Sequence, residues 1–200
     1  MLNLPRNVWI LAICLALFMS LSVFTVFVGG ILGNELASSK SLSTLPVAAI
    51  VVGTAVSIFP VIRLMSIFGR KTVFLMICIY SIALLGLSVF AIITGSFLLF
   101  CLSSFLLGAT VATMNQFRFA AIESVSEEQR ATATAIVLLG GLVSAYLGPE
   151  VATIGKEIFA INFVGSYMLL GLLFLIAFIL LCFFQPAKKF VEESDQSKRS

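Results

Sequence analysis

The sequence contains no histidine among its 200 residues, and charged residues make up only 10% of it. The absence of histidine excludes a histidine proton relay and a histidine-ligated metal site. The scarcity of charge excludes a soluble globular domain, in which about 25% of the residues are charged. Because 60% of the residues are hydrophobic, we expect a membrane protein whose immediate surroundings are the lipid bilayer.

Other signals of chemistry are also missing. The sequence has no HExxH, P-loop or GxSxG motif and no pair of intramembrane aspartates. We therefore predict that the chain is not an enzyme and holds no cofactor and no metal. The net charge of +3 is too small to indicate a nucleic-acid partner. The cysteines lie singly in apolar runs, without CxxC spacing, and are interpreted as packing residues, with a functional role as the alternative: Cys14, Cys78, Cys101 and Cys182.

Six segments are apolar over a length that can cross a membrane as a helix. Such a helix needs about 20 residues, because the hydrocarbon core is about 30 Å thick. We place the spans at residues 8–28, 45–65, 73–93, 97–114 (extending to about 122), 131–152 and 163–184. The predicted fold is an all-α membrane protein with one six-helix bundle over residues 1–186. Residues 187–200 are charge-rich and are predicted to be a cytoplasmic tail or linker.

The lysines and arginines are distributed unevenly between the two sides of the membrane. With six spans, ten of the twelve fall on one side and two, Lys40 and Lys156, on the other. Because positively charged loops stay in the cytoplasm, both termini are predicted to be cytoplasmic. The residues on that side are Arg6, Arg63, Arg70, Lys71, Arg118, Arg130, Lys188, Lys189, Lys198 and Arg199.

The second span of each set of three carries a late proline followed by a glycine and a cation. Pro60 precedes Gly69-Arg70, and Pro149 precedes Gly155-Lys156. The first set ends on the cytoplasmic side and the second on the outer side. Such a pattern is typical of a three-plus-three inverted repeat.

The turn after the second span reads Gly69-Arg70-Lys71, and the glycine allows the chain to reverse there. Six spans, cytoplasmic termini and this basic turn resemble the N-terminal half of a major facilitator superfamily transporter, whose signature here is G-x-x-x-D-R-x-G-R-K. Ile62, Ser66 and Ile67 replace the first glycine, the aspartate and the first basic residue of that signature, so that only Gly-Arg-Lys remains.

Two further elements carry the resemblance. Glu123 and Arg130 have the spacing of the glutamate and arginine that follow the fourth span in sugar-porter-like members, and the region is similar to poorly characterised bacterial permeases of this family. The fifth span resembles a glycine–proline element of family antiporters. Close helix packing and a kinked hinge are alternative roles for that element, whose residues are Gly140, Gly141, Ser144, Gly148 and Pro149.

The fourth span is the best candidate for a cavity or gate, because several small or polar residues project from one side of a continuous helix. The candidates there are Ser104, Gly108, Asn115, Gln116 and Arg118. A guanidinium near the bilayer normally faces protein or water. Arg118 is therefore either a topology anchor that pairs with Glu123 or a gate cation that meets another helix or an anionic solute.

Ser22 and Thr25 are candidate cavity residues of the first span. The alternative is that their hydroxyls only bond the carbonyl four residues earlier, as serine and threonine commonly do in lipid.

The resemblance implies transport of a small solute by alternating access in the bacterial inner membrane. The chain supplies only half of a usual family member, so we expect a second six-helix half or a homodimer as partner. The alternative is a six-span membrane protein without transport activity that binds or scaffolds partners. The sequence does not indicate the substrate.

Overall fold

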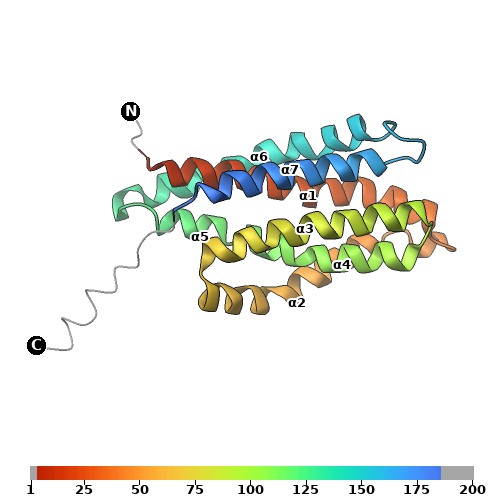
Figure 1. The fold of residues 1–200 in the computed structure, drawn as a ribbon, viewed down its shortest axis with the longest axis horizontal. Coiled ribbons are helices and arrows are strands. Elements are labelled where there is room, and N and C mark those ends of the chain that lie inside the picture. The colour runs from red at the N-terminus through yellow and green to blue at the C-terminus, as the bar shows by residue number, and fades with distance from the viewer. Residues whose placement is uncertain (1–3, 186–200) are drawn as a thin grey trace, which may run out of the picture.

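Residues 4–185 are described by the computed structural model and form six long helices that run back and forth along one direction (Figure 1). All six are long and apolar enough to cross a membrane, which confirms the predicted all-α membrane fold. The predicted tail at 187–200 lies outside the described residues. The long helices are α1 (Arg6–Leu36), α2 (Leu45–Phe68), α3 (Arg70–Ile93), α4 (Phe97–Met114), α6 (Arg130–Gly155) and α7 (Val164–Cys182).

Three short elements lie between the long helices. Helix α5 (Phe117–Ile122) follows α4 after a break at residues 115–116, and the 3-10 turns η1 (Lys40–Leu42) and η2 (Glu127–Gln129) precede α2 and α6. The largest difference from the expected spans is the end of α1, at Leu36 instead of residue 28. The helix continues through Gly29, Gly30 and Gly33. At Gly33 the loop before α2 packs directly on the helix, with the Ser43 carbonyl where a Cβ would be.

One end of the bundle collects most of its positive charge. Helices α1, α3 and α6 begin there, and α2 and α7 end there (Figure 1). The side-chain amide of Asn7 and the backbone of Gln185 exchange two hydrogen bonds at this end, which brings the two described chain ends together. We call it the basic end. Its cations include Arg6, Arg70, Lys71, Arg118 and Arg130.

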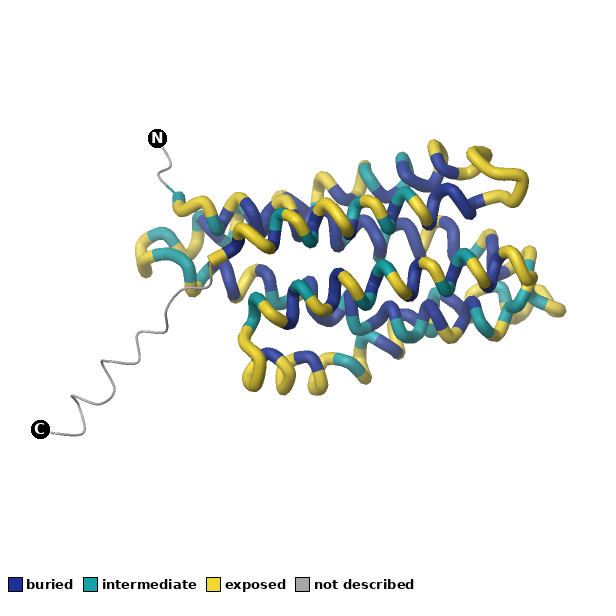
Figure 2. The backbone as a smooth tube through the Cα atoms, viewed as in Figure 1, coloured by how far each residue is buried: buried dark blue, intermediate teal, exposed yellow. Residues whose placement is uncertain are grey.

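Helix α1 is the most buried of the six spans and contacts α2, α4, α6 and α7. No charged residue lies between Arg6 and Glu35, and a helix that is apolar all round has no polar face to turn toward water. Figure 2 shows the buried residues along the inner sides of the helices and the exposed ones on the outer sides and in the loops.

A cluster of phenylalanine rings fills the interior toward the basic end. The ring of Phe18 on α1 lies 4.9 Å from that of Phe117 and 4.8 Å from that of Phe174. Phe74 at the start of α3 approaches Phe117 to 4.6 Å. These centroid distances are those of favourable edge-to-face and tilted aromatic pairs. The cluster joins α1, α3, α5 and α7 into one core.

The helices pack as a three-plus-three inverted repeat. The most extensive contacts are between α1 and α6, between α2 and α4, and between α3 and α7. If α1–α2–α3 is exchanged with α4–α6–α7, the first two pairs replace one another and the third maps onto itself. The two tightest interfaces are therefore repeat equivalents, as the predicted fold class requires.

Glycines lie in both of those interfaces. A Cβ on Gly53 of α2 would lie 1.9 Å from the carbonyl oxygen of Phe105 on α4, and one on Gly140 of α6 would lie 2.4 Å from that of Ala12 on α1. Gly53 precedes Pro60 in α2, and Gly140 precedes Pro149 in α6. In membranes, small residues let helix backbones approach closely where the hydrophobic effect gives no association.

Hydroxyl groups connect α3 to α4 inside the bundle. Ser81 and Thr110 share a hydrogen bond of 2.7 Å, and Ser88 donates to Ser103 at 2.9 Å. All four side chains are buried. Such interhelical bonds in membranes average about 0.6 kcal/mol each, so they align α3 and α4 without dominating their association.

Candidate functional site

The connection between α2 and α3 is the single residue Gly69, with a φ of +79° that favours glycine. Helix α3 consequently starts at Arg70, and its first turn carries both Arg70 and Lys71. Cations at a helix N-terminus are unfavourable, because the helix dipole is positive there. Their position is thus not explained by the stability of α3; it agrees with the excess of lysine and arginine at this end, and both side chains find partners on other elements.

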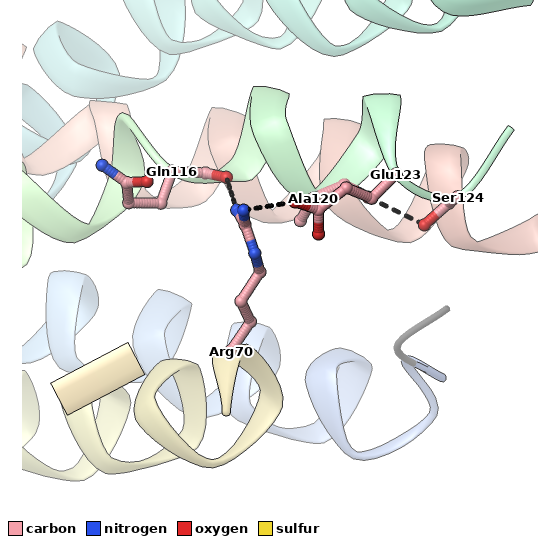
Figure 3. A network of polar contacts seen from close by, with 5 residues as sticks. All are labelled: Arg70, Gln116, Ala120, Glu123 and Ser124. Atoms are coloured by element: carbon pink, nitrogen blue, oxygen red, sulfur yellow. Dashed lines mark hydrogen bonds and ion pairs between the residues drawn. The ribbon is translucent and has the colours of Figure 1, made fainter. Parts of the chain in front are cut away.

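Arg70 reaches from α3 to the segment around α5 (Figure 3). Its Nη2 donates to Oε1 of Glu123 at 2.6 Å, and its Nη1 makes a longer bond, 3.4 Å, to the backbone carbonyl of Gln116. Glu123 directly follows the C-terminus of α5, where a carboxylate is itself poorly placed relative to the helix dipole. The pair therefore places each charge next to a group that stabilises it. We call Arg70, Gln116 and Glu123 the clasp.

Lys71 reaches in a different direction, toward α7. Its Nζ donates to the carbonyl oxygen of Cys182 at 2.8 Å. Cys182 is the last residue of α7, whose final carbonyls have no partner within the helix. A lysine at a helix C-terminus both satisfies such a carbonyl and interacts favourably with the dipole.

Both cations connect the first repeat to the second at the basic end. Arg70 and Lys71 belong to α3, whereas their partners lie after α5 and at the end of α7. In chemical terms, the arrangement can hold the two repeats together by charge-assisted bonds that are accessible to water and can break and re-form.

The expected pairing of Arg118 with Glu123 is wrong. The Glu123 carboxylate pairs with Arg70, and the Arg118 guanidinium lies 4.8 Å from the centre of the Phe119 ring. Two residues five apart on a helix point about 140° away from each other, so they cannot easily meet. Arg130, the first residue of α6, forms its ion pair with Glu127 of η2 at 2.9 Å, outside the clasp.

The candidate residues of the fourth span do not share one face, because the helix stops at Met114. Ser104 and Gly108 are buried inside the bundle, whereas Asn115 and Arg118 are exposed beyond the break. Gly108 faces α2, where a Cβ would lie 2.3 Å from the backbone of Gly53. The expectation of one common face is thus incorrect, and a gate role for Asn115 and Arg118 stays a prediction.

The other candidate residues are placed as follows. Thr25 is buried and its hydroxyl bonds the Leu21 carbonyl, while Ser22 is half-buried.

On α6, Gly148 faces α1 as Gly140 does, and Gly141 faces the Met19 side chain. Ser144 is buried and its hydroxyl bonds the Gly141 carbonyl, while Pro149 lies within the continuous helix α6. Cavity and hinge roles for these residues stay predictions.

Two contacts at the basic end have no signal in the sequence. Lys71 binds the end of α7, which is 111 residues away, and Asn7 binds Gln185, which is 178 residues away. Neither Asn7 nor Gln185 belongs to a motif, and only their meeting in space distinguishes them. Gln116 is a candidate of the fourth span, and the contact that it makes in the clasp is through its backbone carbonyl.

Comparison with known proteins identifies relatives over most of the chain. The profile of the Major Facilitator Superfamily matches residues 8–200. The riboflavin transporter RfnT of Brucella anthropi is 34% identical over 173 residues, which cover 84% of this chain and 43% of that protein. The uncharacterized MFS-type transporter YddS of Bacillus subtilis is 31% identical over 175 residues, 83% of this chain and 39% of that protein.

A third relative, the uncharacterized MFS-type transporter YdeG of Bacillus subtilis, is 32% identical over 130 residues, 64% of this chain and 30% of that protein. No solved structure matches the chain significantly. The chain thus spans less than half the length of each of these three relatives.

Proposed function

The chain belongs to the major facilitator superfamily, and on that premise we propose that its bundle is one half of a carrier that moves a small solute across the membrane by alternating access. It is an integral membrane protein with six apolar spans. The observation that carries the proposal is the clasp, because it joins the two repeats at one end of the bundle by bonds that can open and close. The proposed location is the bacterial plasma membrane, since the relatives are bacterial.

The proposed second half contacts the exposed faces of α2 and α6. These repeat-equivalent helices are the least buried of the six spans. Large apolar side chains are strongly exposed on them, including Phe59 on α2 and Leu142 and Tyr146 on α6. Because the chain spans less than half of its relatives, either another six-helix segment or a second copy of this chain would supply that half.

Reconstitution in liposomes tests the transport proposal. We expect saturable uptake, with counterflow of unlabelled solute, only from preparations whose particles contain two six-helix halves. Riboflavin belongs in the solute panel, because a relative at 34% identity is named a riboflavin transporter. Particle size is measured on the same samples. Uptake by a monomer, or no uptake of any panel member by particles with two halves, would contradict the proposal and favour a partner-binding role.

The basic end is proposed to face the cytoplasm, and cysteine labelling tests this. In a variant without native cysteines, we expect a cysteine at Ser41 to react with a membrane-impermeant maleimide in intact cells, and one at Ser126 to react only after permeabilisation. Both positions are exposed, in loops at opposite ends of the bundle. The reason is the excess of lysine and arginine at the basic end. Labelling of Ser126→Cys in intact cells would contradict the proposal and place the basic end on the outer side of the membrane.

A further inference from the structure

A groove runs between the outer sides of α3 and α7, which lie side by side (Figure 1). It has a volume of about 370 Å³ and is lined by α3 residues between 82 and 89 and α7 residues between 167 and 175. Among the lining side chains, only that of Tyr167 carries an oxygen or nitrogen atom, and its ring packs edge-on against Phe24 with the centroids 5.0 Å apart. No charged or amide side chain lines the groove, which therefore suits an apolar occupant.

Two glycines create the hollow. A Cβ on Gly86 of α3 or on Gly171 of α7 would meet no atom within 4 Å. Glycines elsewhere in the bundle, such as Gly53 and Gly108, lie so close to the backbone of a neighbouring helix that a Cβ would overlap with it. A glycine inside a helix costs about 1 kcal/mol relative to alanine. No contact in the described part of the chain offsets that cost at Gly86 and Gly171, whose common effect is to leave space between the two helices.

The groove lies at a defined depth. Helix α3 starts at the basic end with Arg70, so residues 82–89 lie about 18–28 Å from that end at 1.5 Å per residue. The hydrocarbon core is about 30 Å thick, which places the groove in the leaflet opposite the basic end. Its rim is open to the surroundings, because Met168 and Leu172 of α7 are about half exposed.

We propose that this groove holds one hydrocarbon chain of a membrane lipid from the leaflet opposite the basic end. The groove extends over about 10 Å of helix, whereas a transmembrane helix spans about 30 Å and is about 10 Å wide. It also offers one glycine on each helix instead of the small-xxx-small pair along one helix that favours helix docking. A flexible chain of methylene groups fits both the length and the apolar lining.

The bound chain would fill the outer side of the interface between α3 and α7. At the basic end α3 contacts α7 through Lys71 and the Cys182 carbonyl, and the Phe74 ring packs against that of Phe184, two residues beyond the end of α7. In the other half the lipid chain would fill the space between the two helices. On the outer side of the α3–α7 interface, these two helices would thus be joined by protein contacts at the basic end and by lipid in the opposite leaflet, whereas α1–α6 and α2–α4 join the repeats directly.

Native mass spectrometry of the whole chain tests the proposal. Bound lipid is first removed in detergent, and phosphatidylethanolamine is then added in increasing amounts. We expect one lipid per chain to bind more tightly than the rest. Filling the groove with Gly86→Leu and Gly171→Leu should weaken that site about tenfold, because losing contact with two methylene groups is sufficient for such a change. The matched control is Gly30→Leu, since a Cβ added at Gly30 would also meet no atom within 4 Å but this residue does not line the groove.

A second measurement keeps both glycines and locates the lipid. Trp9 is replaced by phenylalanine, and a single tryptophan is placed at Leu172 in the groove or at Leu142 on the outer side of α6. Phosphatidylethanolamine with brominated chains should quench Leu172→Trp at lower lipid-to-protein ratios than Leu142→Trp. Equal quenching curves, unchanged lipid binding by the filled variant, or protection of Leu172→Trp by a second copy of the chain would each overturn the proposal.

Discussion

Replacing Gly108 by alanine is expected to prevent α2 and α4 from packing as they do here. The added Cβ would lie 2.3 Å from both the carbonyl carbon of Gly53 and the backbone nitrogen of Thr54. These are backbone atoms in the middle of a helix, so no side chain can rotate away and the two helices must separate. Overpacking of a tight core typically costs about 1–3 kcal/mol, and here it also breaks one of the two most extensive interfaces of the bundle.

Thermal unfolding in detergent, followed by size-exclusion chromatography, measures this effect. Gly108→Ala and Gly53→Ala should both lower the midpoint by several degrees or give aggregated protein. Gly86→Ala is the matched control, because its Cβ meets nothing within 4 Å and alanine favours a helix by about 1 kcal/mol. That variant should be as stable as the parent or more so. Equal midpoints for Gly108→Ala and Gly86→Ala would show that the backbones of α2 and α4 do not approach so closely.

The contrast between these glycines shows what sequence patterns can predict. Long apolar segments predict the six spans, because the thickness of the bilayer fixes the length of a spanning helix. Sequence does not show that Gly108 meets Gly53 while Gly86 meets nothing, since that depends on which helices become neighbours. The expected end of the first span at residue 28 failed for a related reason. The helix continues through three glycines despite their low helix propensity, and the loop that packs on Gly33 comes from a part of the chain that the local pattern does not place there.

The clasp shows the same limit for charged residues. Arg70, Glu123 and Arg130 all stand out in so apolar a sequence, but Arg70 and Glu123 are 53 residues apart and belong to different repeats. Proximity in sequence favoured Arg118 as the partner of Glu123, and the helix geometry excludes that pair. The resemblance to a transporter family singled out Arg70 and Glu123 separately, and only the folded chain, in which Arg70 of α3 reaches the end of α5, shows that these two residues meet.

Reversing the charge of Arg70 is expected to cause the largest loss of function among the substitutions at the basic end. In Arg70→Glu, a carboxylate would face Glu123 and the bond to the Gln116 carbonyl would be lost. An attraction of about 1 kcal/mol between unit charges in water becomes a repulsion of similar size. A change of about 2 kcal/mol between open and closed forms alters their ratio more than tenfold. We therefore expect solute uptake to fall about tenfold or more, with Glu123→Arg giving a similar loss.

The double variant Arg70→Glu with Glu123→Arg restores the opposite charges and should recover a substantial part of the uptake. Arg130 and Glu127 supply the matched control, because this ion pair at the same end links η2 to the first residue of α6 and does not join the repeats. Arg130→Glu changes the charge of the basic end by the same amount, so it controls for effects on membrane topology. We expect it to reduce uptake only slightly, since exposed pairs of this kind contribute about 0.2–1 kcal/mol.

These variants distinguish two roles for the clasp: a contact between the repeats that controls transport, or an exposed ion pair with no effect on transport. The Arg70 side chain is 26% exposed and that of Glu123 is 56% exposed, so their contribution to global stability should be small and similar to that of Arg130 and Glu127. If the clasp controls how the basic end opens, Arg70→Glu will reduce uptake while the unfolding midpoint stays close to that of the parent. Equal uptake by Arg70→Glu and Arg130→Glu, or no recovery in the double variant, would leave the clasp a surface contact and remove the main support for the transport proposal.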